Sequence, residues 1–231
     1  MTTGTAVIVG AGHGLSASLV RACAARGMHV ALAARNPDKL APLAGETGAR
    51  VFACDAADAG AVRTLFAQVD AAFGVPEVVV YNASARVRGP LVDVDAEGVS
   101  KALAVTAFGG FLVGQEAVRR MLPAGRGSIL FTGASASVKG YPQSASFAMG
   151  KFALRGLAQS MARELASRGI HVAHFVIDGG IRQPGDPRAA QRGEDGLLDP
   201  DAIARTYLQI HDQPRNAWTW EVELRPWTES F

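Results

Sequence analysis

The chain has 231 residues, of which 48% are apolar and 19% charged. This composition excludes a disordered chain. The length is sufficient for one large domain or two small ones. The formal net charge is +2 and the basic residues are scattered, so nothing indicates a nucleic-acid partner.

The first third of the chain alternates between apolar runs and helical patterns. Residues 5–9 (TAVIV) form a continuous apolar run, which is typical of a strand buried on both faces. The pattern then predicts a helix over 15–26, a strand over 28–33, a short helix over 37–43 with Asn36 as N-cap, and a strand over 50–54. A helix follows in which Val62, Leu65, Phe66, Val69 and Phe73 recur at helical spacing and Asp58 is the expected cap, and residues 77–81 are expected to form a strand.

The remainder continues this alternation. It predicts a long helix over 95–122, a strand over 128–132, a long helix over 144–168 ended by Gly169, a strand over 170–177, a helix over 201–210 and an edge strand over 218–224. Residues 179–200 are irregular and rich in Gly, Pro, Asp and Arg, which is typical of a functional loop. We expect this segment to shape a substrate pocket together with residues 86–92.

The order of elements predicts an α/β fold with a single Rossmann-type domain over residues 1–231. Strands that alternate with helices form a parallel sheet with helices on both faces. Right-handed crossovers then give the doubly wound strand order 3-2-1-4-5-6.

A glycine-rich turn joins the first strand to the first helix. Gly10, Gly12 and Gly14 allow a diphosphate to approach the backbone closely, and the helix that starts at Leu15 offers it free N–H groups. His13 lies in the same turn, where it either adds to the phosphate pocket or is a surface histidine. The turn therefore predicts a nucleotide-binding site.

The residue after the second strand bears on the type of dinucleotide. An NAD site carries Asp or Glu there to bind the ribose 2′-OH, whereas this chain has Arg35. An arginine can pair with a 2′-phosphate, so NADP (NADPH) is favoured over NAD; the alternative is a solvated loop residue. Further candidate contacts follow the third and fourth strands: Asp55, Ala56, Asn82 and Ala83.

Over nearly its whole length the chain resembles the short-chain dehydrogenase/reductase family. Gly10 and Gly14 match the family's TGxxxGxG turn, with Ser16 at the third glycine position. Asp55 matches its adenine-contacting Asp and Asn82-Ala83 its NNAG segment, while Lys151 matches the lysine of YxxxK. The resemblance implies an NAD(P)-dependent oxidoreductase, with Gly179 beside the cofactor after the sixth strand.

Several positions depart from the family pattern. Phe147 stands where the family has its catalytic tyrosine, and Thr106 where it has the helix asparagine. The spacing places the family's catalytic serine at Ala134, with Ser135 and Ser137 as near misses. In the family the tyrosine exchanges the proton of the carbinol–carbonyl pair, and the lysine lowers its pKa and binds the nicotinamide ribose. Phenylalanine has no such proton, so we expect ordinary ketone reduction to be severely impaired, with Lys151 keeping its ribose role.

Other residues are candidate surrogates for the missing acid. Ser135 and Tyr141 are the nearest candidates, and Asp178 follows the sixth strand, although loop polar residues are more often solvated or turn-forming. We expect His174 to be a core histidine. Phe147, Phe152 and Phe175 are expected in the core or in the pocket wall.

Two functions of different class follow. One is an NADP(H)-dependent oxidoreductase with a non-standard site, acting on a small-molecule substrate such as an activated alkene or imine. The other is a catalytically weak or inactive NADP(H)-binding sensor or structural protein. A scaffold that binds no dinucleotide is a weaker third reading, against which the glycine turn, Arg35 and Asp55 argue.

The remaining expectations concern location and partners. Cys23 and Cys54 are expected to be buried free thiols, which fits a cytoplasmic location. No apolar run approaches the ~20 residues of a membrane span, so no membrane partner is expected. The resemblance implies a homodimer or homotetramer formed through the two long helices. The aromatic tail covers a neighbouring subunit, the cleft or its own sheet edge: Trp218, Trp220, Trp227 and Phe231.

Overall fold

The computed structural model describes residues 4–193 and 195–229. Its strands form one sheet in the order β3-β2-β1-β4-β5-β6-β7, and every neighbouring pair is parallel. The predicted order of the first six strands is confirmed, and β7 extends the sheet at the β6 edge. The strands are β1 (Thr5–Val9), β2 (His29–Ala34), β3 (Arg50–Ala53), β4 (Val78–Tyr81), β5 (Gly127–Thr132), β6 (Ile170–Ile177) and β7 (Glu221–Leu224).

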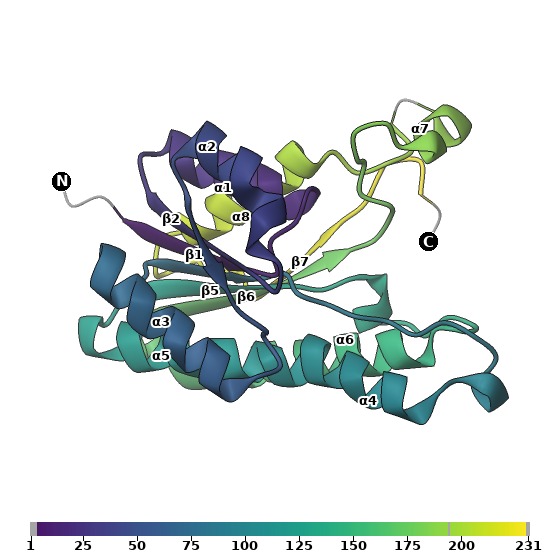
Figure 1. Cartoon of the computed structure of the whole chain (residues 1–231), viewed down its shortest axis with the longest axis horizontal. Coiled ribbons are helices and arrows are strands. Elements are labelled where there is room, and N and C mark those ends of the chain that lie inside the picture. The colour runs from purple at the N-terminus through teal and green to yellow at the C-terminus, as the bar shows by residue number, and fades with distance from the viewer. Residues whose placement is uncertain (1–3, 194, 230–231) are drawn as a thin grey trace.

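Helices cover both faces of the sheet (Figure 1). Because side chains alternate along a strand, Ala6 and Ile8 of β1 pack into one core, and Val7 and Val9 into the other. This is the predicted doubly wound, single-domain α/β architecture. One helical layer consists of α1 (Leu15–Ala25), α2 (Ala41–Thr47) and α8 (Pro200–His211); the other of α3 (Ala59–Phe73), α4 (Ala96–Leu103), α5 (Gly109–Ala124) and α6 (Ala145–Leu165).

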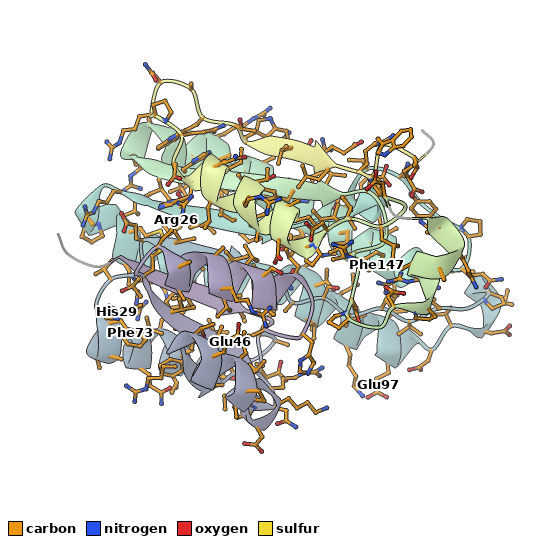
Figure 2. All side chains as sticks on the ribbon, turned by 90° about the horizontal axis from the view of Figure 1, so that it is seen from above. Arg26, His29, Glu46, Phe73, Glu97 and Phe147 are labelled. Atoms are coloured by element: carbon orange, nitrogen blue, oxygen red, sulfur yellow. The ribbon has the colours of Figure 1, made fainter. Side chains whose placement is uncertain are left out.

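The two ends of the sheet differ in character. At the amino ends of the strands, the rings of His29 and Phe73 stack with centres 5.1 Å apart. Phe147 lies at the opposite end, on the side of α7 (Pro187–Arg192) (Figure 2). The carboxyl ends of parallel strands are where folds of this kind bind ligands.

Three predicted segments differ from the structure. The helix expected over 95–122 is α4 and α5 joined by a π-helical turn at Ala104–Phe108. The Tyr81 hydroxyl donates a hydrogen bond to the Val105 carbonyl inside this widened turn. The helix expected over 37–43 is a 3-10 turn (Pro37–Leu40) followed by α2, although Asn36 caps it as predicted. The irregular stretch 179–200 contains α7, whose N-cap is Asp186.

The helical run from Ala96 to Ala124 contains a window with a mean hydropathy of 1.3, and 33% of that window is buried. By length and composition alone this run could cross a membrane. The expectation that no apolar segment is long enough to span a membrane is therefore wrong for this run. Core helices of soluble proteins meet the same criterion, and α5 packs against α3 and α6.

Several side-chain expectations can be compared with the structure. Cys23 and Cys54 are buried and free, and burial raises the pKa of each thiol to about 11. Phe175 lies in the core, but the expectation for Phe152 is wrong, because its side chain is 45% exposed on α6. It faces outward because α6 turns its other side, through residues such as Leu154, towards the sheet.

The aromatic tail packs mainly against the protein's own sheet edge. Trp218 stacks on His171 of β6 with ring centres 4.6 Å apart, and Trp220 lies beneath the guanidinium of Arg155. Trp227 is 81% exposed, and Phe231 lies outside the described residues.

Candidate functional site

A first cleft of about 590 Å³ opens at the carboxyl ends of β1, β2 and β4. It contains most of the predicted cofactor residues and is bordered by the glycine turn at one side and the end of β2 at the other. Those residues are Gly10, Gly12, His13, Arg35, Asp55, Ala56, Asn82 and Ala83.

The glycine turn is held in place by a small hydrogen-bond network. Gly10 has φ +86°, and a Cβ at this position would collide with the backbone nitrogen of Ala83. The Ser16 hydroxyl donates to the Gly10 carbonyl at 3.0 Å and accepts from Asn82 Nδ2 at 2.7 Å. The serine at the third glycine position thus ties the turn to the end of β4.

The next glycines of the turn leave space that a diphosphate can fill. A Cβ on Gly12 or Gly14 would meet no atom within 4 Å. Gly14 is the N-cap of α1 and provides no side-chain cap, so the first N–H groups of the helix are free to bind an anion. Leu15 starts α1 with a buried side chain and can contribute only its backbone.

Two cations border the far end of this cleft. Arg35 and Lys39 both line it, and neither forms an ion pair with any described residue. Lys39 lies in the 3-10 turn that Asn36 caps, and it lines the same cleft as Arg35. Sequence reasoning missed Lys39, although its position after a capped turn was a usable signal. Two unpaired cations fit an additional phosphate.

A second cleft of about 590 Å³ adjoins the first, because Asn82 and Ser84 line both. Here the structure brings together the remaining predicted site residues. They are Lys151, Phe147, Ser135, Tyr141 and Gly179. The expectation that residues 86–92 and 179–200 shape this pocket is met by Arg86, Arg88, Gly180, Ile181, Gln183 and Arg188.

Lys151 is almost fully buried at the base of this cleft. Its Nζ donates a hydrogen bond to the carbonyl oxygen of Thr132, the last residue of β5, at 2.6 Å. Burial, and then the positive charge of Arg86, lower the pKa of Lys151 to about 7. Near neutral pH the amine is therefore present in both charge states.

This burial predicts a stability effect for Lys151→Met. In the unfolded chain lysine stays protonated up to about pH 10.4, whereas the folded protein releases this proton near pH 7. The unfolded state binds more protons between these values, so the penalty is full below pH 7 and fades as pH rises. We expect the variant to be more stable at pH 7 by on the order of a few kcal/mol.

Chemical denaturation between pH 6 and 10 measures this effect. The wild type should gain stability relative to the variant as pH rises. Lys101→Met is the matched control, because Lys101 is 73% exposed and pairs only with Glu97 on α4. A constant difference between wild type and Lys151→Met across this range would contradict the prediction.

Phe147 lies one helical turn before Lys151 and faces the same cleft. The Arg86 guanidinium carbon lies 4.4 Å from the centre of its ring, and Lys151 Nζ lies 5.8 Å from it. The ring thus contacts cations, as the negative face of an aromatic ring favours, and it carries no exchangeable proton.

The candidate surrogates differ in position. Ser135 and Tyr141 line the cleft, and Tyr141 is 43% exposed. Asp178 does not line it and instead pairs with Arg225 at 2.6 Å and with Lys139 at 3.4 Å. These contacts hold the buried Asp178 carboxylate in an ion-pair network outside the cleft lining.

His174 is a buried core histidine, as predicted, with one unusual contact. Its Nδ1 lies 3.0 Å from Glu221, while Nε2 has no hydrogen-bond partner among the described residues. A Cβ on Gly133, in the cleft wall, would collide with this Nε2. Burial lowers the pKa of His174 to about 4 despite Glu221, so the ring is neutral at pH 7.

Comparison with known proteins relates this site to one enzyme family. Residues 4–183 match the profile described as short chain dehydrogenase. The chain is 33% identical to a D-threitol dehydrogenase of Mycolicibacterium smegmatis, over 72% of this chain and 66% of that enzyme. It is 30% identical to a 2,5-dichloro-2,5-cyclohexadiene-1,4-diol dehydrogenase of Sphingobium indicum, over 90% and 81% respectively.

Solved structures agree. A short-chain dehydrogenase from Rhodopseudomonas palustris is 37% identical, with a TM-score of 0.85 over 97% of this chain and 99% of that one. A metagenomic short-chain oxidoreductase in complex with NADP is 25% identical, with a TM-score of 0.85 over 99% of both chains. An alcohol dehydrogenase from Thermococcus sibiricus, complexed with 5-hydroxy-NADP, is also 25% identical, with a TM-score of 0.86 over 99% and 98%.

Proposed function

The chain belongs to the short-chain dehydrogenase/reductase family, and on this premise we propose that it is an NADP(H)-dependent oxidoreductase whose catalytic site lacks the usual tyrosine acid. The observation that carries the cofactor preference is the pair of unpaired cations, Arg35 and Lys39, at the end of β2. Two similar structures that hold NADP or a derivative of it support the same preference.

The residues present fit such a cofactor. Gly10, Gly12 and the free N–H groups of α1 would hold the diphosphate, and Asp55 borders the cleft between the turn and Arg35. A bound nicotinamide supplies or accepts a hydride. Lys151, at the base of the second cleft, would bind the nicotinamide ribose.

The missing tyrosine determines which substrates suit this site. Phe147 provides no proton to a developing alkoxide, and general acid–base help is worth about 10²–10⁴ in rate. An iminium carbon needs no such proton, and the enolate formed from an activated alkene can take its proton from water. We therefore place the substrate in these two classes rather than among simple ketones.

A non-catalytic NADP(H)-binding sensor is the second candidate function. The observation that favours it is that the Arg86 guanidinium, not an acid, covers the ring of Phe147. Following NADPH oxidation with a panel of activated alkenes, imines and ketones separates the two functions. Tight NADPH binding without turnover of any substrate in the panel would favour the sensor.

Cofactor binding gives a direct prediction for Arg35 and Lys39. Because a hydrogen bond to a charged group contributes about 1.5–3 kcal/mol, Arg35→Gln and Lys39→Gln should each weaken NADPH binding about 10- to 100-fold. NADH binding should change less than about twofold, as should NADPH binding by the control Arg168→Gln at the other end of the sheet. Fluorescence titration measures both, and tighter binding of NADH than NADPH by the wild type would contradict the assignment.

We further propose that the chain forms a homodimer or homotetramer through α5 and α6. Their outer faces, and the π-helical turn that leads into α5, expose large apolar side chains that a partner copy would cover: Phe108, Phe111, Met149 and Phe152. Phe152→Glu should lower the mass measured by light scattering to that of a smaller assembly. Val75→Glu, at a comparably exposed loop residue, should leave it unchanged; an unaltered Phe152→Glu assembly would place the interface elsewhere.

A further inference from the structure

The second cleft is cationic in a way that the proposed function does not require. Four basic side chains line it (Arg86, Arg88, Lys151 and Arg188), and its described lining residues include no Asp or Glu. Arg188 is neutralised by a two-point ion pair with Asp186 at 2.9 and 2.6 Å. Arg86 and Arg88 form no ion pair with any residue in the described parts of the chain.

Other arginines, such as Arg35, also lack an ion pair among the described residues, but Arg86 and Arg88 differ from them in that both line the second cleft. Arg155, in contrast, is neutralised by Glu221 through two bonds of 2.6 and 2.7 Å. Arg86 and Arg88 are two residues apart, and burial together with the charge of Arg88 lowers the pKa of Arg86. Two neighbouring cations that repel each other gain most from an anion placed between them.

The segment that carries these arginines is fixed by two hydroxyl groups. Thr106 in the π-helical turn accepts from the backbone N–H of Ala85 at 3.0 Å and donates to its carbonyl at 3.3 Å. Ser146 on α6 does the same to Val87, with both distances 2.9 Å. Each hydroxyl therefore occupies both polar groups of one residue, as a neighbouring strand would.

The consequence is an alternation along the segment. The residues whose backbones are held, Ala85 and Val87, do not line the cleft, whereas Ser84, Arg86 and Arg88 do. An extended chain sends alternate side chains to opposite sides. Thr106 and Ser146 thus orient both arginines towards the cleft, and Arg86 lies above Phe147, the ring next to Lys151.

We propose that Arg86 and Arg88 form a subsite for an anionic group, a carboxylate or a phosphate, of the substrate. This inference deepens the proposed function and rests on it for the term substrate. Guanidinium groups match both anions with paired hydrogen bonds. In this arrangement Arg86 and Arg88 set specificity, and Thr106 and Ser146 are positioning residues.

Calorimetric titration of the NADP-saturated protein tests this subsite, because bound NADP keeps added anions away from Arg35 and Lys39. The probes are glutarate and inorganic phosphate, with neutral glutaramide as the matched control, all at constant ionic strength. We expect glutarate or phosphate to bind and glutaramide not to bind. Arg86→Gln and Arg88→Gln should each weaken anion binding at least about tenfold, with Arg168→Gln unchanged.

The outcomes separate the possible sources and the two proposals. If glutarate binds more tightly than phosphate, the subsite recognises a carboxylate, and if phosphate binds more tightly, it recognises a phosphate. Equal binding by Arg86→Gln, equal binding of glutaramide, or no binding of either anion overturns the subsite. Anion binding without NADPH oxidation on any charged carbonyl, alkene or imine compound leaves the subsite standing while the oxidoreductase proposal fails. Failure to bind NADP, seen first in the cofactor titration, counts against the proposed function alone.

The positioning role has its own readout. Thr106→Val keeps the shape of the side chain but removes the hydroxyl, and it should weaken glutarate binding while NADP affinity stays within about twofold. Thr106→Ser keeps the hydroxyl that Thr106→Val removes, so it should bind glutarate as the wild type does. Loss of anion binding in both variants, or in neither, contradicts the role assigned to this hydroxyl.

Discussion

Phe147→Tyr combined with Ala134→Ser should raise the rate of ketone reduction by about 10²–10⁴, the usual contribution of a positioned general acid. The ring of residue 147 already lies in the second cleft, and Lys151 Nζ is 5.8 Å from its centre. A tyrosine hydroxyl there would be close to two cations, Lys151 and Arg86, which favour its ionised form and lower its pKa.

The serine is included because Ala134 lines the same cleft, and the sequence pattern predicts the family's second hydroxyl group at this position. NADPH oxidation with cyclohexanone and with an aryl ketone measures the gain. Phe152→Tyr is the matched control, since Phe152 lies on the same helix but does not line the second cleft. Unchanged ketone reduction by the double variant, with NADPH binding intact, would favour the sensor function and a more widely altered site.

The elements and the cofactor cleft were predictable because their signals are local. The apolar runs of β1 and β6 and the caps at Asp58 and Gly169 each depend on a few adjacent residues. The glycine turn predicts a nucleotide-binding site only because a strand precedes it and a helix follows it, and both are adjacent to it in sequence. Local signals of this kind fix where a segment begins and ends.

The second cleft could be predicted only in outline because its determinants are contacts between distant segments. Thr106 is 21 residues from Ala85, and Ser146 is 59 residues from Val87. In the sequence, Thr106 is noticeable only because an asparagine is expected at its position from the family resemblance. In the structure, its hydrogen bonds to Ala85 orient the segment that carries Arg86 and Arg88. The π-helical turn likewise depends on the hydroxyl of Tyr81 from another element.

Gly10→Ala should lower the stability of the protein, whereas Gly12→Ala should leave stability nearly unchanged and weaken cofactor binding. At Gly10 the backbone has φ +86° and the new methyl group would collide with Ala83. A left-handed conformation costs a non-glycine residue about 1–2 kcal/mol, and overpacking costs about 1–3 kcal/mol. We expect the melting temperature of Gly10→Ala to fall by roughly 5–15 °C.

At Gly12 the methyl group meets no atom within 4 Å in the protein itself. The melting temperature of Gly12→Ala should therefore stay within about 2 °C of the wild type. The space it fills is the space assigned to the diphosphate, so its NADPH affinity should fall at least about tenfold. Thermal unfolding and NADPH fluorescence titration measure the two effects separately.

Gly27→Ala separates backbone strain from collision in this comparison. Gly27 has φ +74° but open space around its Cβ position, and it lies between α1 and β2, away from the cofactor cleft. Gly27→Ala should therefore lower the stability only by the cost of the left-handed conformation, about 1–2 kcal/mol, and it should bind NADPH as tightly as the wild type does. If Gly12→Ala bound NADPH as tightly as Gly27→Ala does, the diphosphate could not lie against the glycine turn, and the cofactor would have to occupy the cleft in another orientation.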